Sequence, residues 1–79
     1  MIIITQDGEG IVNTKNIIGF YIGDCRIYAV VIDKSEWRLG TYNNKVDTHK
    51  AFDLLKIAMS SKERVFNMPS RAKLGEKSK

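Results

Sequence analysis

The sequence predicts an α+β domain with a mainly antiparallel sheet of four or five strands and one C-terminal helix packed on one face. Residues 1–42 are rich in β-branched and aromatic residues, broken by short turns that contain glycine and acidic residues, as in consecutive antiparallel strands. After Asn44 the apolar spacing changes to three and four residues, which indicates an amphipathic helix. We find no repeat or linker that would divide the chain, and 79 residues suffice for one domain.

The strands follow from short apolar runs between turn residues. We expect extended segments at residues 1–5, 11–13, 16–22, 25–33 and 37–42, with a last short one at 64–69. A two-residue loop at Gly23 and Asp24 suits the longest hairpin, because glycine supplies the positive φ that such loops require. This loop would place Phe20 opposite Ile27 and Ile18 opposite Ala29.

The hairpin has two unlike faces. One face is apolar and is expected beneath the helix: Phe20, Ile22, Cys25, Ile27 and Ala29. The other carries Ile17, Gly19, Tyr21, Arg26, Tyr28, Val30 and Ile32. Because one helix covers only one face of a sheet, this second, partly apolar face is expected to contact another molecule.

The register of the next strand stays open. A two-residue loop at Lys34 and Ser35 would place Trp37 and Leu39 on the second face of the hairpin, here called the Tyr/Arg face because it carries Tyr21, Arg26 and Tyr28. A three-residue loop would place both on the core face and leave Arg38 and Tyr42 outside, since a slip of one residue exchanges the two faces of a strand.

The helix is expected from Lys45 to about Ser61, with Asn44 as its N-cap and the acidic Asp47 in its first turn. Its apolar face comprises Ala51, Phe52, Leu54, Leu55, Ala58 and Met59, and its solvent face His49, Asp53, Lys56 and Ser60. Residues 1–69 would form the single domain. Residues 70–79 would form a basic, flexible tail, because they contain almost no apolar side chains.

The tail accounts for most of the positive charge. Residues 70–79 hold four of the 13 Lys and Arg side chains and one of the nine acidic side chains. That leaves nine basic against eight acidic side chains in residues 1–69, so the globular part is nearly neutral. Nucleic-acid binding by the tail would therefore be weak and dependent on salt.

Several kinds of chemistry are not supported by the sequence. It has no Gly-x-Ser-x-Gly elbow or Gly-rich phosphate loop, and its one histidine, His49, falls on the solvent face of the helix. A single cysteine, Cys25, excludes an internal disulfide and a Cys/His metal site, and a core thiol fits a reducing cytoplasm. The apolar start of the chain is too short for a signal peptide or membrane span. We predict a cytoplasmic protein that is not an enzyme, without metal or cofactor and without membrane contact.

Five residues are the candidate interaction site: Tyr21, Arg26, Tyr28, Trp37 and Arg38. These residue types dominate binding hot spots between proteins. The first hypothesis is a protein-interaction module, a homo-oligomer such as a homodimer, that binds another protein chain. The second is nucleic-acid binding through the Tyr/Arg face and the basic tail. The third is capture of a small anionic ligand at a subunit interface.

Four stretches together carry a family resemblance: IIITQDGEGIVNTKNI, IYAVVID, LGTYNNKVDTHKAFDLLKIAM and VFNMP. In this order they resemble a group of small proteins of Gram-positive bacteria and their phages to which no activity is assigned. The resemblance covers residues 2–69, and its motifs are structural, so no catalytic residue carries over. It implies a cytoplasmic bacterial or phage accessory protein with a sheet-plus-helix fold, and it points to a host protein as a partner.

Overall fold

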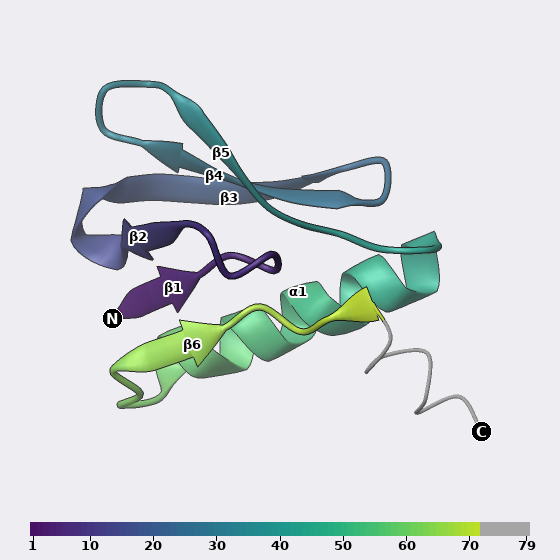
Figure 1. Cartoon of the computed structure of the whole chain (residues 1–79). Helices are drawn as coiled ribbons and strands as arrows, with labels where there is room; N and C mark the ends of the chain where they lie inside the picture. The colour runs from purple at the N-terminus through teal and green to yellow at the C-terminus, as the bar shows by residue number, and fades with distance from the viewer. Residues whose placement is uncertain (72–79) are drawn as a thin grey trace.

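The structure is a computed structural model that describes residues 1–71. It is an α+β fold with two small sheets and one long helix, which confirms the predicted class (Figure 1). The elements are β1 (Ile2–Ile4), β2 (Ile11–Asn13), the 3-10 helix η1 (Thr14–Asn16), β3 (Ile17–Gly23), β4 (Arg26–Val31), β5 (Glu36–Thr41), α1 (Lys45–Ser60) and β6 (Val65–Asn67).

The prediction of one sheet with four or five strands is wrong. The strands form two three-stranded sheets, with the orders β2-β1-β6 and β3-β4-β5. The helix is not the last element, because β6 follows it and pairs in parallel with β1, with Phe66 opposite Ile3. The three-residue strands β1 and β2 are too short to continue the meander, and their partner β6 comes from the far end of the chain.

The β3-β4 hairpin turns one residue later than predicted. Gly23 pairs with Arg26, so the loop is Asp24 and Cys25, and Asp24 adopts the positive φ of 55°. An aspartate tolerates this conformation because its short side chain can hydrogen-bond locally. Phe20 therefore lies opposite Ala29 rather than Ile27. Moving the pairing by two residues keeps the side chains of Gly19–Gly23 and Arg26–Val30 on their predicted faces. It moves Cys25 from the core strand into the turn, where it is half-buried.

Two irregularities decide which side chains of the meander point inward. The faces expected for Ile17 and Ile18 are wrong. A bulge at Ile18 turns Ile17 toward the core and leaves Ile18, which was expected opposite Ala29 beneath the helix, 63% exposed. In β5, Trp37 pairs with Ala29 and Arg38 with Tyr28, but Gly40 pairs with Ile27, so Leu39 is an additional, buried residue.

The β4-β5 turn settles the register that the sequence left open. The backbone N–H of Val31 donates to the carbonyl of Ser35 at 3.0 Å, which closes a three-residue loop. Trp37 and Leu39 therefore lie on the core side, as the three-residue alternative predicts. The expectation that Tyr42 stays outside is wrong, because the bulge at Leu39 turns Tyr42 inward and buries it.

The helix begins as predicted. The side chain of Asn44 accepts a hydrogen bond from the backbone N–H of Asp47 at 2.8 Å. Ala51, Leu55 and Ala58 are buried and Phe52 and Leu54 half-buried, while the predicted solvent face is exposed. Met59 was expected inside but is 45% exposed, because it lies at the margin of the apolar stripe near the end of the helix.

The core lies between β3-β4-β5 on one side and α1 with β2-β1-β6 on the other (Figure 1). Its buried residues are Ile3, Val12, Ile27, Ala29, Val31, Leu39, Tyr42, Ala51, Leu55 and Met68. Within residues 1–71, no helix is long and apolar enough to cross a bilayer. At the end of the described chain, Arg71 donates two hydrogen bonds to Oδ1 of Asn43, at 3.1 and 2.8 Å. The remainder of the predicted flexible tail, residues 72–79, lies outside the described residues.

Gln6 joins the two sheets. Its backbone N–H donates to the carbonyl of Leu39 at 2.8 Å. Its side-chain Nε2 donates to the carbonyl of Thr41 at 2.9 Å, and its Oε1 accepts from the N–H of Thr41 at 3.0 Å. The amide thus satisfies backbone groups of β5 that would otherwise lack a partner strand.

Tyr42 gives the fold a dependence on alkaline pH. Its hydroxyl donates to the carbonyl of Pro69 at 3.0 Å, and burial raises the pKa of Tyr42 to about 12. The folded pKa exceeds the unfolded pKa, so this stabilisation is complete below about pH 10 and is lost as pH rises toward 12. We expect the urea concentration at the unfolding midpoint of the wild type to decrease as pH rises from about 10 to about 12. The midpoint of Tyr42→Phe should decrease less over the same pH range. An equal decrease in both proteins would contradict the assignment.

Candidate interaction surface

One face of the meander faces away from the rest of the molecule. We define the outer sheet face as Tyr21, Arg26, Tyr28, Val30, Glu36 and Arg38, which share one side of β3-β4-β5 by their pairing. In Figure 1, α1 and β2-β1-β6 lie on the opposite side of this sheet. No element of residues 1–71 covers the outer sheet face. The structure therefore brings together four of the five predicted site residues.

Tyr21 and Tyr28 form the centre of this face. They are opposite each other across β3 and β4, and their rings stack with centroids 5.1 Å apart and planes inclined by 21°. Gly23 leaves room for them, since a Cβ at this position would lie 3.2 Å from Cε2 of Tyr28. The Tyr21 hydroxyl donates to Oε1 of Glu36 at 2.5 Å, and this hydrogen bond raises the pKa of Tyr21 above its ordinary value. The hydrogen bond and the stacking together hold the Tyr21 ring against that of Tyr28.

Two arginines flank the tyrosine pair. Arg38 lies directly opposite Tyr28, and Arg26 precedes Tyr28 by two residues on the same face. Both side chains are exposed, and within residues 1–71 neither forms a salt bridge. The outer sheet face thus offers two exposed guanidinium groups and two aromatic rings beside the carboxylate of Glu36. Arg38 also lies within electrostatic reach of the Asp7 carboxylate.

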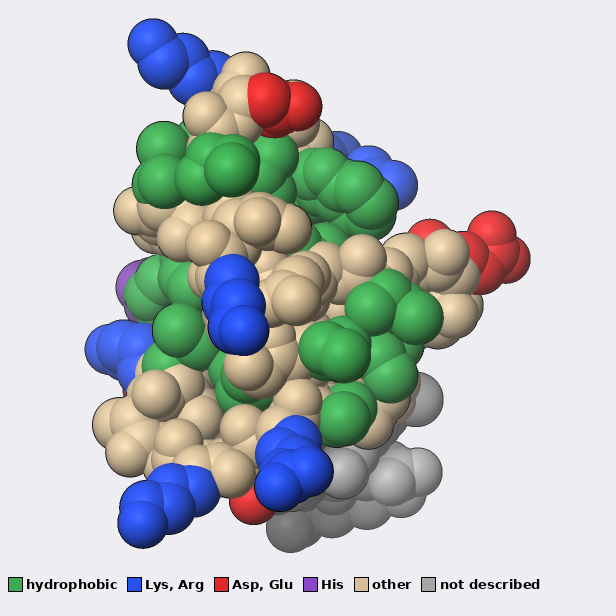
Figure 2. Space-filling view, turned by 90° about the vertical axis from the view of Figure 1, so that its left-hand side faces the viewer, with side chains coloured by type: hydrophobic (Ala, Val, Ile, Leu, Met, Phe, Trp, Pro, Cys, Tyr) green, Lys and Arg blue, Asp and Glu red, His purple; other side chains and the backbone are tan. Residues whose placement is uncertain are grey.

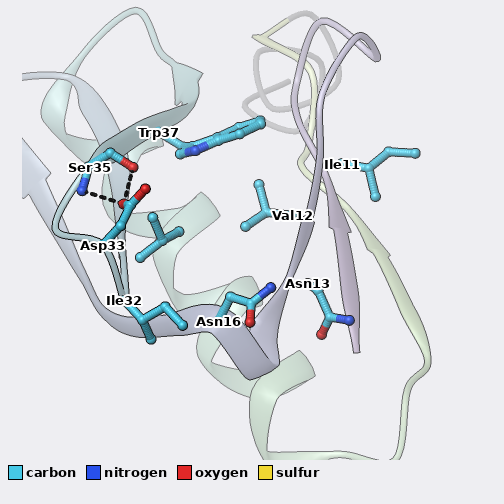
Figure 3. A pocket seen from close by; sticks show the side chains of 9 residues that line it. Ile11, Val12, Asn13, Asn16, Ile32, Asp33, Ser35 and Trp37 are labelled. Atoms are coloured by element: carbon cyan, nitrogen blue, oxygen red, sulfur yellow. Dashed lines mark hydrogen bonds between the residues drawn. The ribbon is translucent and has the colours of Figure 1, made fainter.

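Trp37 does not belong to this face. It pairs with Ala29 on the core side of β5, at the open end of the sheet, and it is 41% exposed. There its indole forms one wall of a hollow of about 390 Å³ between β2 and the β4-β5 turn (Figure 3). A Cβ at Gly10 would lie 3.3 Å from Cζ3 of Trp37, so the glycine leaves space for the ring.

The hollow was missed by sequence reasoning. It is lined by Ile11, Val12, Asn13, Asn16, Val31, Ile32, Asp33, Ser35 and Trp37. Ile11 and Ile32 are both 64% exposed, which their apolar character did not indicate. The Asp33 carboxylate is engaged by the Ser35 side chain and N–H, at 2.6 and 2.8 Å, and these bonds lower the pKa of Asp33. This carboxylate is therefore used to shape the turn.

Figure 2 views the molecule from the left of Figure 1. Hydrophobic side chains form separate groups on this side, with Lys and Arg side chains, uncharged polar side chains and backbone between them. This side therefore does not present one continuous apolar area of the kind that marks a large protein interface.

The residues considered for catalysis lie apart from the outer sheet face. His49 is exposed on α1, and Cys25 is half-buried in the β3-β4 turn. No three His, Cys, Asp or Glu side chains among residues 1–71 come together to hold a metal ion. Comparison with protein-family models, curated proteins and solved structures finds no match for this chain.

Proposed function

We propose that the chain is a non-enzymatic protein-interaction module that contacts another protein chain through the outer sheet face. One observation carries the proposal: a stacked tyrosine pair lies next to two exposed arginines on a sheet face that no described element covers. Tyrosine and arginine dominate protein hot spots because they combine a large contact area with directed polar groups. A rigid ring loses little conformational entropy on binding.

The arrangement also indicates the chemistry of the partner. Arg26 and Arg38 can each hold a carboxylate through two parallel hydrogen bonds. The rings of Tyr21 and Tyr28 and the half-buried Val30 offer apolar contact beside the two arginines. The surface therefore fits a partner with acidic side chains next to an apolar patch.

Nucleic-acid binding is the second candidate, and the stacked tyrosines with flanking arginines favour it, since bases stack on such rings. Against it stands Glu36, whose carboxylate shares the face and would repel phosphate groups. The near-neutral charge of residues 1–69 also offers little phosphate neutralisation. The third hypothesis, capture of a small anion, has two arginines in its favour, but they lie on an open face and not in the Trp37 hollow.

Capture from a bacterial lysate tests the proposal when charge-matched variants serve as bait. We compare the wild type with Arg38→Glu and with Lys50→Glu, which makes the same charge change on the exposed face of α1. Proteins retained by the wild type and by Lys50→Glu should fall at least about tenfold with Arg38→Glu, as for a hot-spot arginine. Equal retention by all three baits would contradict the proposal.

The same variants separate protein from nucleic-acid binding. Fluorescence anisotropy with labelled single- and double-stranded oligonucleotides should show weak affinity that falls steeply between about 50 and 200 mM salt. If the wild type instead binds firmly at the higher salt and Arg38→Glu abolishes that binding, the outer sheet face is a nucleic-acid surface.

A further inference from the structure

The outer edge of β3 is open. Among residues 1–71, β4 is the only strand that pairs with β3, whereas the free side of β5 is occupied by Gln6 at Leu39 and Thr41. The seven residues of β3, IIGFYIG, contain no charged residue and no proline. Charged residues and proline usually protect an edge strand, because an exposed apolar edge without them pairs readily with another strand. The bulge at Ile18 interrupts only the start, so Gly19–Gly23 is a regular five-residue segment.

The ladder determines which backbone groups face this edge. A two-residue loop makes Gly23 and Arg26 the hydrogen-bonded pair that closes the hairpin. Hydrogen-bonded and non-hydrogen-bonded pairs alternate along an antiparallel ladder. The backbone N–H and C=O groups of Phe20 and Ile22 therefore point toward the open edge and can bond to a further strand.

We infer that two copies of this chain join at their β3 edges, antiparallel, with the two-fold axis at Tyr21. This inference goes beyond the proposed function, because it concerns the β3 edge and a second copy of the chain and not the outer sheet face. Tyr21 lies opposite Tyr21 of the partner subunit, and Phe20 lies opposite Ile22 of the partner subunit. The axis is placed at Tyr21 because this residue is the centre of the regular segment, so that all five residues pair.

Side chains on both faces suit this register. On the outer face, the tyrosines of both copies form one row, and the glycines beside them leave space, since a Cβ at Gly19 would meet no atom within 4 Å. On the inner face, Phe20 and Ile22 are only half-buried, although both pack against the core. Pairing with the second copy covers their remaining exposed surface, which supplements the small core of a chain of this length.

Charge complementarity favours a second copy in antiparallel orientation. The paired segment is uncharged, so two copies bring no like charges together along it. The acidic Asp24 follows one end of β3, and the basic Lys15 precedes the other, both exposed. Antiparallel pairing sets the Asp24 end of each copy beside the Lys15 end of the other. This interface leaves Arg38, two strands away, free to contact a different protein.

Sedimentation equilibrium of the full chain at tens of micromolar tests the inference. We expect a mass of about 18 kDa for the wild type, twice the 9.0 kDa of one chain. Tyr21→Lys should raise the dimer dissociation constant at least about tenfold, because it sets two ammonium groups opposite each other. Tyr21→Phe and Arg38→Glu should remain dimeric. A monomeric wild type, or an undiminished dimer for a folded Tyr21→Lys, would overturn the inference.

Disulfide trapping tests the register in a Cys25→Ser background. Tyr21→Cys should cross-link to itself under mild oxidation, because non-hydrogen-bonded partners have Cα atoms about 4.5 Å apart, within disulfide range. Arg38→Cys is the control: it lies on the same face but two strands from the edge, and it should not cross-link to itself. A mixture of Gly19→Cys and Tyr21→Cys proteins should give only the Tyr21→Cys homodimer, and a predominant mixed product would place the axis at Phe20 and overturn this register.

The two proposals can fail separately. If the wild type is monomeric while Arg38→Glu still abolishes partner capture, the edge pairing is wrong and the proposed function stands. If the Tyr21→Cys dimer forms while Arg38→Glu captures the same proteins as the wild type, the edge pairing stands and the outer sheet face loses its proposed role.

Discussion

Leu55→Ala is expected to lower the free energy of unfolding by about 2–5 kcal/mol, as for truncation of a fully buried leucine. Leu55 is 1% exposed and belongs to the core between α1 and both sheets. The substitution leaves a cavity in a close-packed region and barely changes helix propensity. Urea unfolding followed by circular dichroism measures the loss.

Met59→Ala is the matched control for this prediction, because Met59 is on the same helix but 45% exposed. Its loss should be well below that of Leu55→Ala. His49→Ala, on the solvent face, should cost under about 0.5 kcal/mol. Losses of equal size at Leu55 and His49 would mean that a different face of α1 packs on the core.

Gln6→Ala should cost about 2–3 kcal/mol, because it breaks hydrogen bonds to backbone groups and leaves the N–H of Thr41 without its acceptor. The lost Nε2 also donates to the carbonyls of Thr41 and Pro69, at 2.9 and 3.3 Å. Its removal breaks the hydrogen bonds that connect Gln6 to β5 and to Pro69, which follows β6. Urea unfolding again measures the loss.

Gln6→Glu tests whether the amide acts through its donor. The variant keeps an acceptor for Thr41 but sets an ionised carboxylate against two carbonyl oxygens. It should be destabilised at pH 7 and regain stability as pH falls to about 4, where protonation restores a donor. A Gln6→Glu protein as stable as the wild type at pH 7 would contradict this role of the amide.

Local patterns predicted the elements well. The helix begins at Lys45 with Asn44 as its cap, and the strands around residues 17–23, 26–31 and 36–41 are present. Between Gly19 and Val30 the side chains of the β3-β4 hairpin lie on their predicted faces although the turn moved by one residue, whereas the bulge exchanges the faces of Ile17 and Ile18. Both results depend on neighbours in sequence, where alternation and capping chemistry act directly.

Tertiary arrangement was not predictable in the same way. The division into two sheets depends on β6 pairing with β1, and two three-residue strands carry too little pattern to identify each other. Met59 was expected on the buried face, but it lies at the margin of the stripe and is exposed although its neighbour Ala58 is buried. Strand pairing and burial at a helix end depend on the length and position of the elements packed alongside. The hydrophobic periodicity of one segment carries no information about those neighbours.

The candidate surface was predicted in part for the same reason. Tyr21, Arg26 and Tyr28 lie on strands whose alternation identifies one face, and the structure brings them together. Arg38 joins them and Trp37 does not, because a three-residue loop sets the register of β5. The bulge at Leu39, which carries Tyr42 into the core, lies next to Gly40, and an isolated glycine within a strand is the signal that could have indicated it.

Site-specific photo-crosslinking tests the central claim, contact with another protein chain through the outer sheet face, most directly. Benzoylphenylalanine replaces Tyr28 on that face or, as the control, Val46, which is 64% exposed on α1. After irradiation in a bacterial lysate, we predict adducts with a protein chain from position 28, reduced by Arg38→Glu, and few from position 46. Equal adducts from both positions, or adducts with nucleic acid alone from position 28, would contradict the account.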